Sequence, residues 1–230
     1  MKDARLSLFE HIEELRKRLF KALMALVVTT LISLIFTEKL VRILTEPIGG
    51  PEALQSIEVT ENISVYMRVS LLMGLILAMP VIVYQLLGFI IPGLTDRERR
   101  YVLLAVPSAS LLFLGGALFA YWVMLPVAVP FLIDFMGIPT VPRPANYIGF
   151  VTNLMLWIGL AFETPLLIFI LAKLGLVTAG MLVRHWRVAI VVIAVLAAVA
   201  TPTVDPVNMG LLMLPLSLLY LLSILLAKLA

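Results

Sequence analysis

The chain has 230 residues, of which 62% are hydrophobic and only 13% carry a charge. Soluble domains average about 45–50% apolar and about 25% charged residues, so most of this chain belongs in lipid. A net charge of +3 is too small to indicate nucleic-acid binding. The chain has no cysteine, which excludes disulfides, thiolate metal sites and cysteine nucleophiles.

The first segment, residues 1–18, favours an amphipathic helix on the membrane surface. Leu8, Ile12, Leu15 and Leu19 recur at helical spacing and form one apolar stripe. The apolar run that follows is longer than the roughly 7–15 residues of a cleavable signal core. We therefore interpret it as a retained first span.

The hydropathy pattern predicts an all-α integral membrane protein with six transmembrane helices in one polytopic domain, residues 1–230. The expected spans are about 19–37, 65–91, 101–132, 147–174, 188–200 and 209–227. The fifth span is unusually short, about 20 Å as a helix against a hydrocarbon core of about 30 Å. The third is about 48 Å long and must tilt or bend, with prolines 107, 126 and 130 as bending points.

The polar segment 38–64 predicts a structured cap with short helices. Leu40, Ile43 and Leu44 have the spacing of one helical face, and Pro47 with the glycines after it should end that helix.

The distribution of basic residues predicts the topology. Thirteen of the 17 Lys and Arg residues lie in the N-terminal segment, the loops 92–100 and 175–187 with the adjacent Lys173, and the C-terminus. The other side holds only Lys39, Arg42, Arg68 and Arg143. The positive-inside rule places both termini in the cytoplasm and the cap outside it.

Glu163 is the one acid well inside a predicted span. A charged carboxylate at the bilayer centre costs roughly 2.5–3.5 kcal/mol, so such a residue usually faces a partner or a cavity. Pro165 frees the carbonyl of Ala161 at the same depth. We interpret Glu163 as a contact for a polar group on another membrane helix or as a proton site; a protonated, hydrogen-bonded structural Glu is the alternative.

Glu14 and Glu98 lie in segments at the cytoplasmic edge, each with basic neighbours. Glu14 can pair with Lys17 or Arg18 at helical spacing. From the residues alone, two ordinary surface ion pairs are the simpler interpretation. The alternative is a pair of carboxylates presented to guanidinium groups, which bind carboxylates bidentately as lysine cannot.

The remaining polar residues give weaker indications of function. Asp205 in TPTVDP is expected to cap the last span, with Pro206 at the first helical position. His11 and His185 are isolated, and no metal-ligand spacing, catalytic triad or glycine-rich phosphate loop occurs.

Four separated motifs carry a family resemblance: HIEELRKRL at 11–19, PVIVYQLLGFIIPGLTDRERR at 80–100, FETP at 162–165 and TPTVD at 201–205. In order and spacing the chain resembles the TatC family, the multispanning core of the twin-arginine protein translocase. The resemblance covers nearly the whole chain, although the tail after the last span is shorter than in many relatives.

The resemblance implies a receptor for the signal peptides of folded export proteins. By motif position, Glu14 and Glu98 match the family's twin-arginine recognition residues, Arg16 matches its N-terminal arginine, and Phe89 and Pro92 match its FxxP. Glu163 matches the intramembrane acid associated with the single-span partners TatA and TatB. Glu61 and Asp205 resemble acidic positions of the extracytoplasmic side whose roles the sequence leaves open.

The resemblance also implies a setting and a mechanism. The protein is expected in the bacterial cytoplasmic membrane, with the lipid bilayer and, as one option, a second copy of itself as further partners. Export is driven by the proton-motive force, without a cofactor, a catalytic residue or an enzymatic reaction. The rival interpretation is a proton-coupled small-molecule transporter with Glu163 as proton carrier; an intramembrane hydrolase ranks last because it lacks a nucleophile and base.

Overall fold

A computed structural model describes residues 8–90, 96–134, 137, 140–201 and 206–230, with the side chains of 8–11, 90 and 96–103 excepted. Every regular element in this part of the chain is helical. Five helices or helix pairs are long and apolar enough to cross a membrane, and a sixth apolar helix, α9, is shorter. This confirms the predicted all-α membrane fold with a short fifth span.

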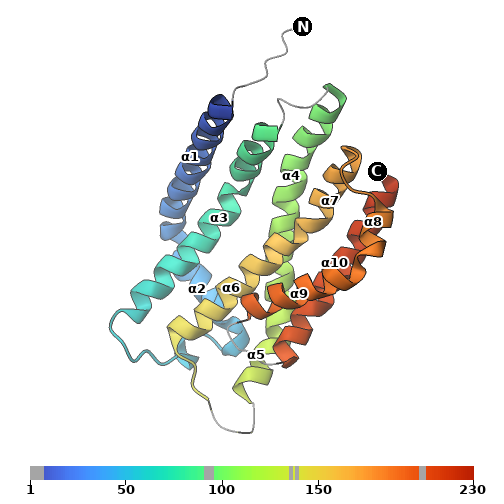
Figure 1. The fold of residues 1–230 in the computed structure, drawn as a ribbon. Helices are drawn as coiled ribbons and strands as arrows, with labels where there is room; N and C mark the ends of the chain where they lie inside the picture. The colour runs from blue at the N-terminus through green and yellow to red at the C-terminus, as the bar shows by residue number, and fades with distance from the viewer. Residues whose placement is uncertain (1–7, 91–95, 135–136, 138–139, 202–205) are drawn as a thin grey trace.

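The elements follow one another in a simple order along the chain (Figure 1). They are α1 (Leu8–Ser33), α2 (Thr37–Thr45), α3 (Glu61–Ile90), α4 (Asp96–Phe119), α5 (Leu125–Ile133), α6 (Pro144–Phe162), α7 (Thr164–Lys173), α8 (Ala179–Arg184), α9 (Trp186–Ala200) and α10 (Pro206–Leu229). The start of α1, the end of α3, the start of α4 and the C-terminus lie at one end of the bundle (Figure 1).

The long third hydrophobic segment is divided rather than continuous. A π-helical turn, Ala120–Met124, separates α4 from α5, and Pro126 follows directly. Proline at that position cannot donate to the carbonyl of Trp122, which favours a wider turn there. Of the three prolines predicted as bending points, this one coincides with the irregularity, whereas Pro107 and Pro130 lie inside helices.

Helices α1 and α3 pack closely through a glycine. A Cβ added to Gly74 would lie 2.7–2.8 Å from backbone atoms of Thr30, so no larger residue fits without moving a helix. The Thr29 hydroxyl donates to the Gly74 carbonyl at 2.7 Å. The buried hydroxyls of Thr37 and Ser70 meet at 2.6 Å. These polar contacts hold α1 and α2 against α3 where lipid provides no competing water.

The cap beneath the bundle contains the predicted short helix α2, which gives way to a 3-10 turn containing Pro47 and then Gly49 in the left-handed conformation. The cap is tied to the bundle by two tyrosines. Tyr121 donates to the carbonyl of Ile43 at 2.8 Å, and Tyr147 to that of Leu44 at 2.9 Å. The region therefore has a fixed position relative to the spans.

Candidate functional site

Glu14 is paired with an arginine of its own helix. Arg18, one turn later on α1, donates from Nε and Nη2 to the same oxygen, Oε1 of Glu14, at 2.9 and 2.6 Å. Both side chains are only 25% exposed. This confirms the predicted pairing with Arg18. Lys17 instead contacts Glu13, with 2.7 Å between Nζ and Oε1.

A glycine of α3 makes room for this pair. A Cβ added to Gly88 would clash with Nη1 of Arg18, so the guanidinium lies directly against the backbone of α3. Phe89, the next residue, is half-buried at the same level. Sequence reasoning singled out Phe89 but missed Gly88; a glycine inside an apolar helix was the available signal.

The structure describes the other predicted recognition residues only in part. Glu98 is the third residue of α4, and its side chain lies outside what the structure describes. Pro92 lies outside the described residues altogether. Arg16 is exposed and, two positions from Glu14, lies about 200° around the helix. The structure therefore brings Glu14 and Phe89 to the same level of the bundle and turns Arg16 away from them.

Glu163 stands at the break between α6 and α7. Pro165 cannot donate to the carbonyl of Ala161, and the first helix ends at Phe162. The side chain is 9% exposed and its carboxyl lies against the backbone of Phe113 in α4. Its Oε1 accepts no hydrogen bond from the described residues. The carboxyl thus keeps an unused hydrogen-bonding position inside the membrane.

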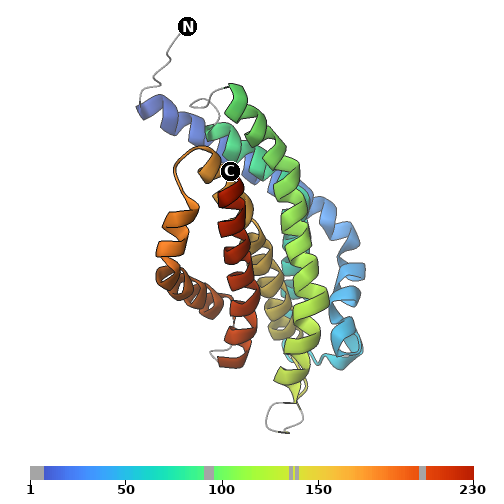
Figure 2. The ribbon, with the colours of Figure 1, turned by 90° about the vertical axis from the view of Figure 1, so that its right-hand side faces the viewer.

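An apolar cavity of about 460 Å³ lies beside this break, between the α6–α7 pair and the helices α9 and α10. Ala161 and Thr164, on either side of Glu163 in sequence, both line it, as do Trp157 and Tyr220. Figure 2 shows α9 lying obliquely next to α10 on this side of the molecule. The cavity is lined mainly by apolar side chains, and Glu163 lies between two of its lining residues in sequence without lining it itself.

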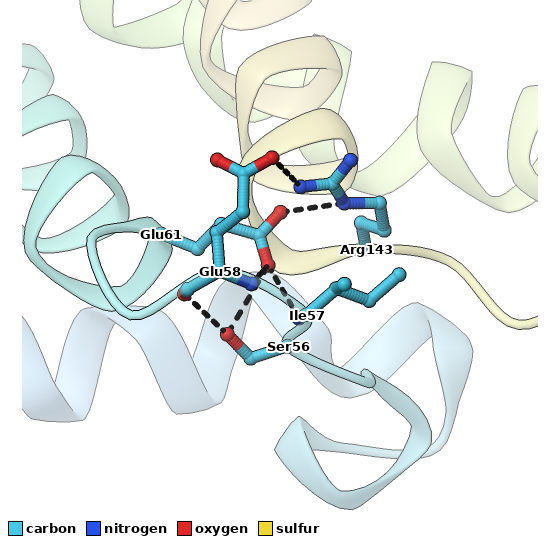
Figure 3. Close-up of polar contacts among 5 residues, drawn as sticks. All are labelled: Ser56, Ile57, Glu58, Glu61 and Arg143. Carbon is cyan, nitrogen blue, oxygen red and sulfur yellow. Dashed lines mark hydrogen bonds and ion pairs between the residues drawn. The ribbon is translucent and has the colours of Figure 1, made fainter.

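At the opposite end, Glu61 forms the centre of a polar cluster (Figure 3). Its Oε2 accepts from the backbone N–H groups of Ile57 and Glu58, at 2.9 and 3.4 Å, and from the Ser56 hydroxyl at 3.1 Å. Its Oε1 accepts from Nε of Arg143 at 2.7 Å, while Nη2 of Arg143 reaches Glu58 at 2.8 Å. The hydrogen bond to Glu58, and to a lesser extent the one to Glu61, raises the pKa of the Arg143 guanidinium, which stays charged.

This cluster, which we call the cap clamp (Ser56, Glu58, Glu61 and Arg143), joins the cap to the start of α6. Glu61 itself is 3% exposed. The sequence suggested Glu61 but not Arg143, because 82 residues separate the partners. Asp205, the other predicted acid of this side, lies outside the described residues, and α10 begins at Pro206. Its capping role stays a prediction.

Within the described residues, no group of three or more His, Asp or Glu side chains could hold a metal ion. The candidate sites are thus a carboxylate paired with a guanidinium, a buried acid beside an apolar cavity, and the cap clamp. Each suits recognition or structural support.

Comparison with known proteins gives consistent matches. A model of the family "Sec-independent protein translocase protein (TatC)" matches residues 10–215. The TatC protein of Carboxydothermus hydrogenoformans is 35% identical over 99% of this chain and 95% of its own length. That of Deinococcus radiodurans is 37% identical over 96% and 85%. A crystal structure described as the twin arginine translocase receptor TatC superposes with a TM-score of 0.84 at 34% identity, covering 95% of this chain and 98% of that one.

Proposed function

The chain belongs to the TatC family of Sec-independent protein translocase proteins, and on that basis we propose that it is the receptor for twin-arginine signal peptides. The peptide's arginines bind the carboxylates of Glu14 and Glu98 at the cytoplasmic surface. Both termini then lie in the cytoplasm, and the protein resides in the bacterial cytoplasmic membrane. The relatives are named as translocase proteins, which favours this function over a small-molecule transporter.

The contact between Arg18 and Glu14 is the observation that carries this proposal. A guanidinium already occupies the carboxylate in a half-buried position against the backbone of α3. A visiting arginine can make the same charge-assisted contact, either by replacing Arg18 or by binding the second carboxylate oxygen. A lysine in that place supplies a point charge without the fork of donors, so the site discriminates between the two.

Glu98 completes the site as the second carboxylate. It lies in the first turn of α4, and that turn is at the same end of the bundle as the start of α1 and the end of α3 (Figure 1). Phe89 and Pro92 belong to the same end by sequence position and shape the surface around the two acids, whereas Arg16 contributes from the opposite face of α1.

The apolar part of the peptide and the partner subunits use the membrane-embedded surface. TatA and TatB present polar groups of their single spans to Glu163, whose Oε1 has no partner among the described residues. The apolar cavity lined by Ala161 and Thr164 accepts helical apolar side chains next to that acid. The proton-motive force drives transport of the folded cargo, and the protein itself forms no permanent pore.

The test is a binding titration of the purified full chain in mild detergent. A labelled signal peptide with Arg-Arg is compared with the same peptide carrying Lys-Lys, for the wild type, Glu14→Ala and Glu98→Ala. We expect the Lys-Lys peptide and either variant to lose about tenfold or more in affinity. Glu13→Ala is the matched control, because Glu13 is the neighbouring acid of α1 and pairs with Lys17 in solvent.

If both Glu14→Ala and Glu98→Ala keep the wild-type affinity for the Arg-Arg peptide, the two acids do not form the receptor site. An equal loss in Glu13→Ala would show a general effect of surface charge rather than a site.

A further inference from the structure

Arg68 is a cation in a membrane-spanning helix, and it has no anionic partner among the described residues. It lies seven residues into α3, about 10 Å along the helix from Glu61. It is exposed and makes no ion pair or hydrogen bond with the described residues. An arginine this near the end of a membrane-spanning helix can extend its guanidinium to the headgroup region, where anionic groups are available to bind it.

The neighbouring helix α6 is shaped to receive the guanidinium. A Cβ added to Gly149 would lie 2.7 Å from Nη1 of Arg68, so the guanidinium lies directly against the backbone of α6 at this glycine. Asn146 and Asn153 lie on the same face of α6, at i−3 and i+4 from that glycine. Both are exposed and have no hydrogen-bond partner among the described residues.

These polar groups line one cavity. It measures about 760 Å³ and is bounded by Arg68, the start of α6, the end of α5 and the segment that precedes α6. Arg143 also lines it, although its charge is already balanced by the cap clamp. Among the described residues, the hollow is thus lined by one guanidinium that makes no ion pair, that of Arg68, and by two amides that make no hydrogen bond.

A second hollow of about 360 Å³ begins at the same two residues, Arg68 and Asn153, and is otherwise lined mainly by apolar side chains. Leu71 and Leu75 follow Arg68 on α3, and Leu156 follows Asn153 on α6, all toward the middle of the bundle. The site is therefore amphipathic along the membrane normal. It is polar and cationic near the helix starts and apolar toward the bilayer centre.

We propose that this α3–α6 site binds an anionic phospholipid of the leaflet opposite the Glu14 end. The phosphate is bound by Arg68, which offers a fork of donors, and the headgroup hydroxyls bind Asn146 and Asn153. One acyl chain lies along Leu71, Leu75 and Leu156. A free phosphate matches the polar half only, whereas a lipid satisfies both halves at once and meets the helix at headgroup depth.

The experiment is native mass spectrometry of the full chain in detergent, titrated with phosphatidylglycerol. Phosphatidylcholine with identical acyl chains and soluble glycerol phosphate are the comparison ligands. Arg68→Gln removes the cation, and Asn153→Leu removes an amide without changing the charge. The matched control is Arg42→Gln, which removes an exposed arginine of α2 that is paired with Glu38.

We expect Arg68→Gln to weaken phosphatidylglycerol binding about tenfold or more, Asn153→Leu to weaken it less, and Arg42→Gln to leave it unchanged. Unaltered phosphatidylglycerol binding by Arg68→Gln overturns the site. Equal affinity for phosphatidylcholine overturns its preference for anionic lipid. Competition by glycerol phosphate at the lipid's own concentration reduces the site to a phosphate site and overturns the lipid assignment.

Discussion

Glu61 and Glu163 are both buried carboxyls, and their hydrogen bonds differ. Glu61 uses both oxygens, with backbone N–H groups, a hydroxyl and the Arg143 guanidinium as donors. Glu163 leaves Oε1 without a partner among the described residues. Since an unused buried polar group is expensive, it persists where another molecule supplies the missing donor. We therefore propose that Glu61 contributes to stability and that Glu163 contributes to interaction with a partner.

Replacing Glu61 with Gln should lower the thermal unfolding midpoint by several degrees in detergent. The amide lacks the negative charge that faces Arg143. Its N–H₂ group cannot accept a hydrogen bond, so some of the donors around residue 61 lose their acceptor. Glu58→Gln is the control, because Glu58 is 63% exposed and makes only the outer contact. A midpoint for Glu61→Gln no lower than that for Glu58→Gln would contradict a stabilising clamp.

Glu163→Gln should separate two functions. We expect signal-peptide affinity to stay within about twofold of the wild type, because the residue lies away from the Glu14 end, while recruitment of TatA and TatB falls. Co-purification of the partners and peptide titration on the same preparation measure both. A parallel loss of peptide binding would argue against this division.

At the scale of elements, α4 and α6 are held together by close backbone contact. A Cβ added to Gly116 would lie 2.8 Å from Cα of Gly159 and 2.9 Å from the carbonyl oxygen of Ile158. Backbone atoms cannot move aside as a flexible side chain can, so the two helices would have to separate. This contact sits in the same pair of helices that positions Glu163 against Phe113.

Gly116→Ala should therefore destabilise the protein by about 1–3 kcal/mol in equilibrium unfolding. The adjacent Gly115→Ala provides a matched control, since a Cβ there has nothing within 4 Å. It should be neutral or slightly stabilising, because alanine favours the helix. Equal effects of the two substitutions would mean that helix propensity, and not the close approach, decides the outcome.

Helix α9 is the short element of the set, with 15 residues and a length of about 22 Å. A bilayer next to it is expected to thin, which lowers the cost of moving cargo past that side. Inserting one helical turn of leucines and alanines into α9 should leave peptide binding intact and reduce export in reconstituted vesicles. Undiminished export by the lengthened protein would contradict the thinning model.

At the scale of the whole molecule, hydropathy and helical spacing predicted the helices. Contacts between residues far apart in the sequence were not predicted. Hydropathy is a local property, so the short α9 and the helix α2 followed from the sequence. The Glu14–Arg18 pair also followed, because its residues are one turn apart. The position of Arg18 against Gly88 and the bond from Arg143 to Glu61 depend on how helices pack, which composition and periodicity do not encode.

The central claim is that Glu14 binds an arginine of the signal peptide, and a double-mutant cycle measures that contact directly. Peptide affinities are determined for the wild type and Glu14→Gln, each with the Arg-Arg peptide and with peptides in which one arginine is glutamine. The account predicts a coupling free energy of about 1.5–3 kcal/mol for one of the two arginines, roughly ten- to a hundredfold in affinity. Additive effects for both arginines would mean that Glu14 does not contact them, and the receptor site would have to lie elsewhere.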